Sequence, residues 1–129
     1  MPAAAAMKVL IVDDQQSVRE VTRMTLEQIG IRMIYDAENG NAALQAVTRQ
    51  PVDLIISDYN MPEMDGLGLL RAVRSHPHVR RLPFILLTGR GDKELVVKAA
   101  QAGVNNYLVK PFDATILRTK IEQVVGKLS

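Results

Sequence analysis

The stretch "LIISDYNMPEMDG", residues 54–66, decides the fold. Its first four residues belong to the largely apolar run "VDLIIS" (52–57). That run ends at an acidic residue, Asp58, and a turn that contains a proline follows. Continuous apolar runs of this length are typical of parallel strands that are covered on both faces. We therefore expect a buried strand that ends on a carboxylate.

Similar short runs alternate with helical patterns along the rest of the chain. Further strands are predicted at 7–12, 31–37, 83–88 and 105–109, and helices at 15–29, 39–50, 65–75, 91–102 and 113–127. Gly30 and Gly103 follow two of these helices, where a left-handed cap is favoured. Five strand–helix units with short connections predict one α/β domain, a doubly wound five-stranded parallel sheet. We expect the flavodoxin-like strand order 2-1-3-4-5, with helices on both faces.

Composition narrows the class of protein. The 129 residues fit a single domain. Sixteen basic and fourteen acidic residues leave a net charge of only +2, too small an excess to indicate nucleic-acid binding. The lack of cysteine excludes disulfides and thiolate metal sites, and no apolar run is long enough to span a membrane. We expect a cytoplasmic protein that binds neither DNA nor membranes, with residues 1–6 as a disordered leader and 7–129 as the domain.

Polar side chains stand at the carboxyl ends of the predicted strands, the edge at which ligands bind in this fold. They are Asp13, Asp14, Asp58, Thr88 and Lys110. Three carboxylates at one edge repel each other unless a cation joins them, and hard oxygen ligands favour Mg²⁺.

With a cation beside it, Asp58 becomes a plausible nucleophile toward phosphorus. Lys110 and Thr88 supply a positive charge and a hydroxyl donor for phosphoryl oxygens. Phosphoryl transfer needs mainly positioning and charge neutralisation, and this set of residues offers both.

Four motifs in order carry a resemblance to a known family. "VLIVDD" (9–14) with Arg19 downstream, "DLIISDYNMPEMDG" (53–66), "PFILLTG" (83–89) and "AGVNNYLVKPF" (102–112) resemble the CheY-like receiver domain of two-component response regulators. The resemblance covers nearly the whole chain.

The resemblance implies a role for each motif residue. Asp58 would accept a phosphoryl group from a histidine kinase or a histidine phosphotransfer protein. Mg²⁺ would be held by Asp13, Asp14, Asp58 and the backbone carbonyl of Asn60, and Lys110 would contact the phosphoryl group.

Other implied roles concern signalling. Thr88 and Tyr107 would form the switch pair, and the Lys110–Pro111 peptide bond would be cis. Asn60 and Arg90 occupy positions that tune the lifetime of the phosphoryl group in such domains.

The resemblance also implies an output surface, formed by the helix at 91–102, the strand at 105–109 and the helix at 113–127. Its basic residues are Lys93, Lys98, Arg118, Lys120 and Lys127. They are either solvated lysines and arginines or a docking face for an acidic partner. The expected protein is no enzyme beyond its own phosphorylation and dephosphorylation, and is a monomer or a weak phosphorylation-linked dimer.

Several alternatives stay open. A stand-alone receiver would act on a motor, in a phosphorelay or on a kinase, whereas an excised receiver would belong to a longer regulator or hybrid kinase. A small phosphatase or a flavin-binding protein on the same fold is disfavoured, because the first strand is followed by neither D-x-D nor a hydroxyl-rich loop. His76 and His78 are interpreted as part of a polar loop, in a basic stretch (71–81) that has a nucleotide or an acidic segment as its other possible partner.

Overall fold

The computed structural model of the chain describes residues 2–89 and 93–129. Its strands are β1 (Lys8–Val12), β2 (Met33–Ala37), β3 (Leu54–Asp58), β4 (Phe84–Thr88) and β5 (Asn106–Val109). Its helices are α1 (Gln16–Ile29), α2 (Gly40–Arg49), α3 (Gly66–Ser75), α4 (Lys93–Gln101) and α5 (Ala114–Val125), preceded by a short 3₁₀ helix, η1 (Ala4–Ala6). All ten predicted elements are present and end close to the predicted positions, although residues 91 and 92 of the helix expected at 91–102 lie outside the described residues, as does Arg90.

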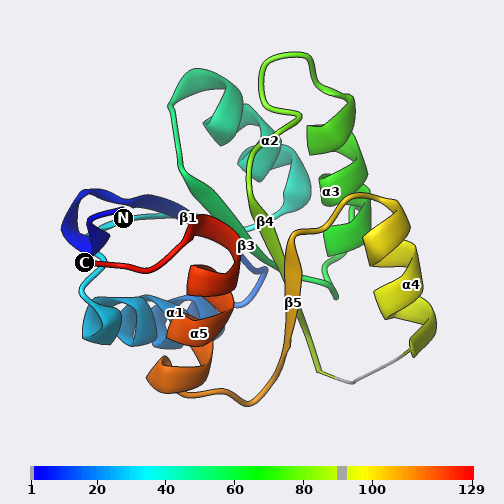
Figure 1. Ribbon diagram of the computed structural model, residues 1–129. Helices are drawn as coiled ribbons and strands as arrows, with labels where there is room; N and C mark the ends of the chain where they lie inside the picture. Colours follow the sequence, from blue (N-terminus) through cyan, green and yellow to red (C-terminus); the bar gives the residue numbers. More distant parts are fainter. Residues whose placement is uncertain (1, 90–92) are drawn as a thin grey trace.

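The strands form one parallel sheet in the order β2-β1-β3-β4-β5, which confirms the predicted fold. Helices α1 and α5 cover one face of the sheet, and α2, α3 and α4 cover the other (Figure 1). Gly30 (φ 102°) and Gly103 (φ 92°) have the left-handed backbone expected of residues that end helices. Because β1, β3 and β4 are adjacent and parallel, their carboxyl ends meet at one edge of the sheet.

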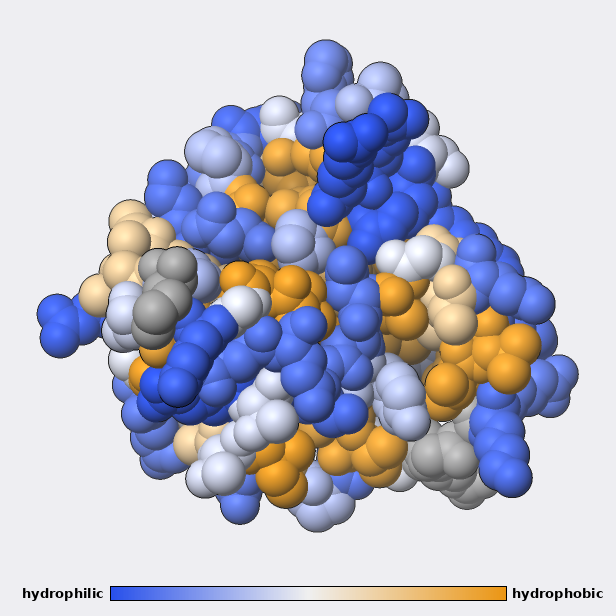
Figure 2. All heavy atoms as spheres, viewed as in Figure 1, coloured by the Kyte–Doolittle hydropathy of each residue, from blue (hydrophilic) through white to orange (hydrophobic). Residues whose placement is uncertain are grey.

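Each face of the sheet has its own hydrophobic cluster, because successive strand side chains point to opposite faces. On the α1–α5 face, Ile11 and Ile56 pack with Leu26 and Leu117, whereas Phe84 belongs to the cluster beneath α2, α3 and α4. The hydrophobic residues visible in Figure 2 form separate patches among hydrophilic ones. The apolar residues of the central strands are therefore buried in these two clusters.

The first residues differ from the disordered leader expected at 1–6. In the described part of this segment, residues 4–6 form η1, and Ala4 is buried. The Ala4 amide donates to the carbonyl of Ser129 at 3.1 Å, and the Ser129 amide donates to the carbonyl of Pro2 at 3.0 Å. The two chain ends therefore pair through their backbones, a long-range contact that the local composition does not indicate.

Among residues 2–89 and 93–129, no helix is both long enough and apolar enough to cross a membrane.

Candidate functional site

Three carboxylates gather at the carboxyl edge of the central strands. Asp13 and Asp14 follow β1, and Asp58 is the last residue of β3, the strand that pairs with β1. One carboxylate oxygen from each of the three lies within 4.8 Å of the others. Asp13 and Asp58 are buried, with 3% and 7% of their surface exposed, whereas Asp14 is exposed. The predicted acidic cluster is therefore assembled, with one member open to solvent.

Asp13 is held by its backbone and by one side-chain oxygen. Its amide donates to the Ala37 carbonyl at 3.2 Å, and its Oδ1 accepts from the Gln15 amide at 2.9 Å. Its Oδ2 is buried without a hydrogen-bond donor among the described residues. Burial, followed by the negative charges of Asp58 and Asp14, raises the pKa of Asp13, while the Gln15 amide and Lys110 oppose the rise. A buried carboxylate oxygen without a donor is suited to a cation.

Lys110 brings the positive charge to this cluster from the end of β5. Its Nζ lies 2.5 Å from Oδ1 of Asp58 and 3.8 Å from Oδ2 of Asp13. The lysine side chain is 31% exposed, so the ion pair with Asp58 lies at the mouth of the site. The peptide bond from Lys110 to Pro111 is cis, the isomer implied by the resemblance.

The other predicted site residues lie on the same side of the sheet or along β5. Thr88 is buried and ends β4, opposite Val109 in the β4–β5 register. Tyr107 pairs with Leu86, is half-buried and packs against the cluster beneath α2, α3 and α4. Asn60 is exposed in the loop after β3. Thr88 thus joins the edge of the acidic cluster, whereas Tyr107 lies lower on the neighbouring strand.

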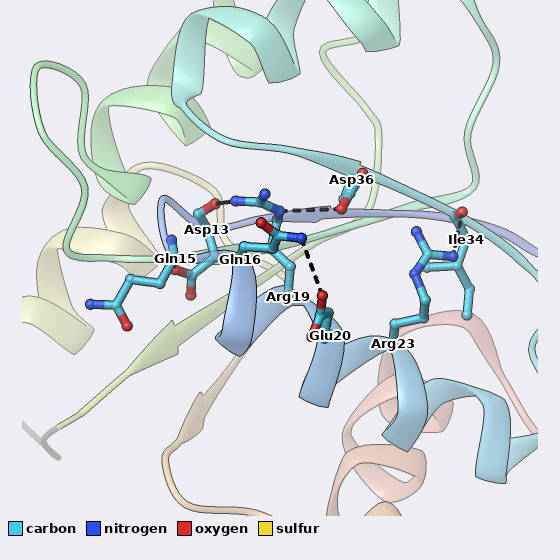
Figure 3. Close-up of polar contacts among 8 residues, drawn as sticks. All are labelled: Asp13, Gln15, Gln16, Arg19, Glu20, Arg23, Ile34 and Asp36. Carbon is cyan, nitrogen blue, oxygen red and sulfur yellow. Dashed lines mark hydrogen bonds and ion pairs between the residues drawn. The ribbon is translucent and has the colours of Figure 1, made fainter.

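Arg19 takes part in the site in a way that its position in the sequence does not reveal. Its Nη1 donates to the backbone carbonyl of Asp13 at 2.7 Å, and its Nε pairs with Oδ2 of Asp36 at 3.2 Å (Figure 3). One guanidinium therefore links α1, the end of β1 and β2. Asp13 lies six residues before Arg19 and Asp36 lies 17 residues after it, and only the spacing of Arg19 after the "VLIVDD" motif indicated a role.

Gly66 supports the site from below. Its amide donates to the Tyr59 carbonyl at 2.8 Å, which joins the start of α3 to the residue after Asp58. A Cβ at this position would overlap the backbone carbonyl of Asp58 and the side chain of Leu86. The glycine that ends the "MPEMDG" motif therefore lets α3 begin directly against the acceptor strand.

The donor set fits Mg²⁺. The three carboxylates supply hard oxygen ligands, the preferred ligands of this ion. The oxygen of Asp13 that lacks a donor and the solvent-exposed side of Asp14 leave room for a cation that retains water.

Within the basic stretch at 71–81, Arg74 has a structural role. Arg74 donates to the carbonyls of Gly103, Arg80 and Leu82 and to Oδ1 of Asn105, at 2.7 to 3.0 Å. Desolvation by burial lowers the pKa of its guanidinium. His76 accepts the amide of His78 at 3.2 Å, as expected of a polar loop, and the two histidines belong to no metal-binding group of His, Cys, Asp and Glu in the described residues.

A parallel β2-β1-β3-β4-β5 sheet with three aspartates and a lysine at its carboxyl edge defines the class of receiver domains. The family model described as "Response regulator receiver domain" matches residues 9–122, and the chain belongs to this family.

Named relatives extend the match to nearly the full chain. The chain is 46% identical to a probable chemotaxis protein CheY of Rhizobium etli, with 99% of each protein covered. It is 38% identical to the chemotaxis protein CheY of Pseudomonas aeruginosa, over 95% of this chain and 99% of that protein.

Solved structures give the same result. The chemotaxis response regulator CheY4 of Vibrio cholerae superposes with a TM-score of 0.84 at 34% identity, covering 92% of this chain and 98% of that one. The receiver domain of a Pseudomonas aeruginosa sensor histidine kinase superposes with a TM-score of 0.83 at 30% identity, covering 94% and 98%. That structure holds a magnesium ion coordinated in its active-site cleft.

Proposed function

We propose that Asp58 is the phosphoacceptor of this receiver domain. The observation that carries the proposal is its position: a buried carboxylate at the end of β3, paired with Lys110 and grouped with Asp13 and Asp14. The donor is a phosphohistidine on a histidine kinase or on a histidine phosphotransfer protein.

The transfer step follows from the residues around Asp58. A carboxylate oxygen of Asp58 attacks phosphorus, the bond between phosphorus and the histidine nitrogen breaks, and the nitrogen leaves with its electron pair to be protonated from solvent. Lys110, now 2.5 Å from Asp58, exchanges this partner for an oxygen of the phosphoryl group. Thr88 donates its hydroxyl hydrogen to another phosphoryl oxygen.

Asp13, Asp14, Asp58 and the carbonyl of Asn60 are the proposed ligands of Mg²⁺. When bound there, Mg²⁺ would neutralise the carboxylates and the incoming phosphoryl oxygens, a charge contribution that phosphoryl-transfer sites generally require. Asp13 offers its Oδ2, because its Oδ1 is already engaged by the Gln15 amide.

The signal leaves through the surface of α4, β5 and α5. The phosphoryl group adds about −1.5 to −2 charges and three acceptor oxygens at the end of β3. Thr88 moves toward these oxygens, and Tyr107 on the adjacent strand turns further inward. Lys120 of α5 lies with its Nζ 5.1 Å from the centre of the Tyr107 ring, so a turn of this ring alters the output surface directly.

The downstream partner is proposed to be a protein. The names of the relatives favour a chemotaxis role over the phosphorelay and kinase-adaptor roles. On the output surface Lys98 pairs with Glu94 and Arg118 with Glu122, which leaves Lys93 and Lys127 exposed for an acidic segment. The domain is proposed to catalyse only its own phosphorylation and dephosphorylation.

The acceptor role is tested by labelling with acetyl phosphate and Mg²⁺. The wild-type protein gains one phosphoryl group by intact mass, and hydroxylamine removes it, as expected of an acyl phosphate. Asp58→Asn should not be labelled, whereas Asp65→Asn, which alters a carboxylate that caps α3 by accepting from the Gly68 amide, should be labelled as the wild type. Undiminished labelling of Asp58→Asn would show that the acceptor is another residue.

A further inference from the structure

Arg19 lies behind the acidic cluster, on the first turn of α1. Its side chain is only 14% exposed and is fixed by two partners, the Asp13 carbonyl at 2.7 Å and the Asp36 carboxylate at 3.2 Å. Figure 3 shows the guanidinium lying between these two oxygens, with α1 on one side and the strand of Asp36 on the other. It touches none of the carboxylates of the acidic cluster, so any effect on the site passes through the backbone.

The backbone group that Arg19 holds is the peptide between Asp13 and Asp14. A peptide unit is planar, so fixing its carbonyl oxygen also fixes the nitrogen and the Cα of the next residue. Asp13 has a second anchor in the Gln15 amide, and its own amide is held by the Ala37 carbonyl. Asp14 has no such anchor, because its exposed carboxylate takes part in no hydrogen bond or ion pair within residues 2–89 and 93–129. The direction of the Asp14 side chain therefore depends on the peptide that Arg19 orients.

We infer that Arg19 is a positioning residue for the proposed Mg²⁺ site, and that Asp36 fixes Arg19 in turn. The inference rests on the proposed function of the acidic cluster. Without Arg19, the Asp13–Asp14 peptide can rotate, and Asp14 must be ordered at the moment a cation binds. Partners that orient metal ligands in this way commonly change metal affinity by about 10- to 100-fold when they are removed.

Arg23 provides a matched control one turn further along α1. Its Nη1 also donates to a backbone carbonyl, that of Ile34 on β2, at 3.1 Å. The contact resembles that of Arg19 in type, and Figure 3 shows it further along β2, away from Asp13. A general weakening of the packing between α1 and the sheet would lower the Mg²⁺ affinity of both arginine variants. A specific effect on Asp14 would lower it only in the Arg19 variant.

The experiment measures Mg²⁺ binding to the unphosphorylated protein by calorimetry and by the amide shift of Asp14 in NMR spectra. Arg19→Ala should weaken Mg²⁺ binding by about tenfold or more, with a broadened or displaced Asp14 amide signal in the free protein. Arg19→Lys should bind Mg²⁺ with an affinity between those of the wild type and Arg19→Ala, because one ammonium cannot reproduce the fork that reaches two oxygens. If Arg19→Ala does not fold, Arg19→Lys serves as the test variant. Asp36→Asn should weaken binding less than Arg19→Ala, since the hydrogen bond to Asp13 remains.

Arg23→Ala should bind Mg²⁺ as the wild type does, whatever its melting temperature. Unchanged Mg²⁺ affinity in both Arg19 variants would overturn the inference, and so would an equal loss in Arg23→Ala. Asp13→Asn and Asp14→Asn separate this inference from the proposed site: if both variants keep the wild-type affinity, the cluster is not the Mg²⁺ site. If Asp14→Asn loses binding and Arg19→Ala does not, only the positioning role is wrong.

Discussion

Replacing Asp13 by asparagine should stabilise the metal-free protein at neutral pH. The Oδ2 of Asp13 is buried without a donor, and Asp58 and Asp14 carry the same charge nearby. Asparagine keeps the shape of the side chain and an oxygen for the Gln15 amide, but removes the buried charge. The substitution therefore removes the unfavourable free energy of burying this charge, which the wild-type protein has when no cation is bound.

The size of the gain follows from the burial of this single group. A buried polar atom that lacks a partner costs about 1–3 kcal/mol, and the partial attraction to Lys110 at 3.8 Å reduces that cost. We expect the free energy of unfolding to rise by about 1–2 kcal/mol, with an increase in Tm of roughly 3–8 °C for a chain of this size. Urea unfolding in the presence of EDTA measures the gain, with an unchanged m-value.

The gain should depend on pH in a defined direction. Burial raises the pKa of Asp13 above its ordinary value of 3.8, so the folded state binds this proton more tightly than the unfolded state. The contribution of Asp13 to wild-type stability therefore falls as the pH rises from 3.8 through the folded pKa. The advantage of Asp13→Asn should be complete at neutral pH and should shrink as the pH falls through the folded pKa.

With Mg²⁺ present, the wild type should be more stable than Asp13→Asn. A ligand present at 100 times its dissociation constant stabilises the folded state by about 2.7 kcal/mol, and the variant should lose most of this gain. Asp65→Asn, a change at a carboxylate that is hydrogen-bonded outside the cluster, should show neither the metal-free stabilisation nor the loss of the Mg²⁺ effect. A metal-free Asp13→Asn protein less stable than the wild type at neutral pH would refute the reasoning.

Two further substitutions test the support of the site and the basic stretch. Gly66→Ala places a methyl group against the Asp58 carbonyl and Leu86, so unfolding should cost about 1–3 kcal/mol less and labelling by acetyl phosphate should slow. Chemical denaturation and a labelling time course measure both, and wild-type behaviour would show that the start of α3 can move aside. Arg74→Ala removes donors to four oxygens and should destabilise by about 2–4 kcal/mol, whereas the exposed neighbour Arg71→Ala should change stability by less than about 0.5 kcal/mol. Equal effects of the two arginine substitutions in urea unfolding would contradict this structural role for Arg74.

The central strands were predictable because their side chains are buried on both faces. Leu54, Ile55 and Ile56 lead to Asp58 with only Ser57 between them, and in the structure every residue of β3 is buried. Position at the end of a parallel strand then placed Asp13, Asp14 and Asp58 at a common edge before any distance was known. The acidic cluster follows from the strand order alone.

The contacts that the sequence did not reveal join residues far apart in the chain. Arg19 and Asp36 belong to different elements, and no spacing rule links them. Arg74 lies in a basic stretch typical of an exposed surface, yet its guanidinium is enclosed by carbonyl groups from two loops. The alanine-rich start reads as disordered because its partner, Ser129, is at the other end of the chain.

Because α1 packs with α5, the face of the sheet that they cover is completed only when the last helix has been synthesised. Helices α2, α3 and α4 cover their face of the sheet one after another, each soon after its strand has been made (Figure 1). On the other face, Leu26 of α1 packs in a cluster that needs Leu117 and Ile121 from the last helix. A chain that ends before α5 therefore has one completed face and one face that α1 alone covers. Such a chain exposes apolar surface to aggregation and proteolysis, whatever the stability of the part already made.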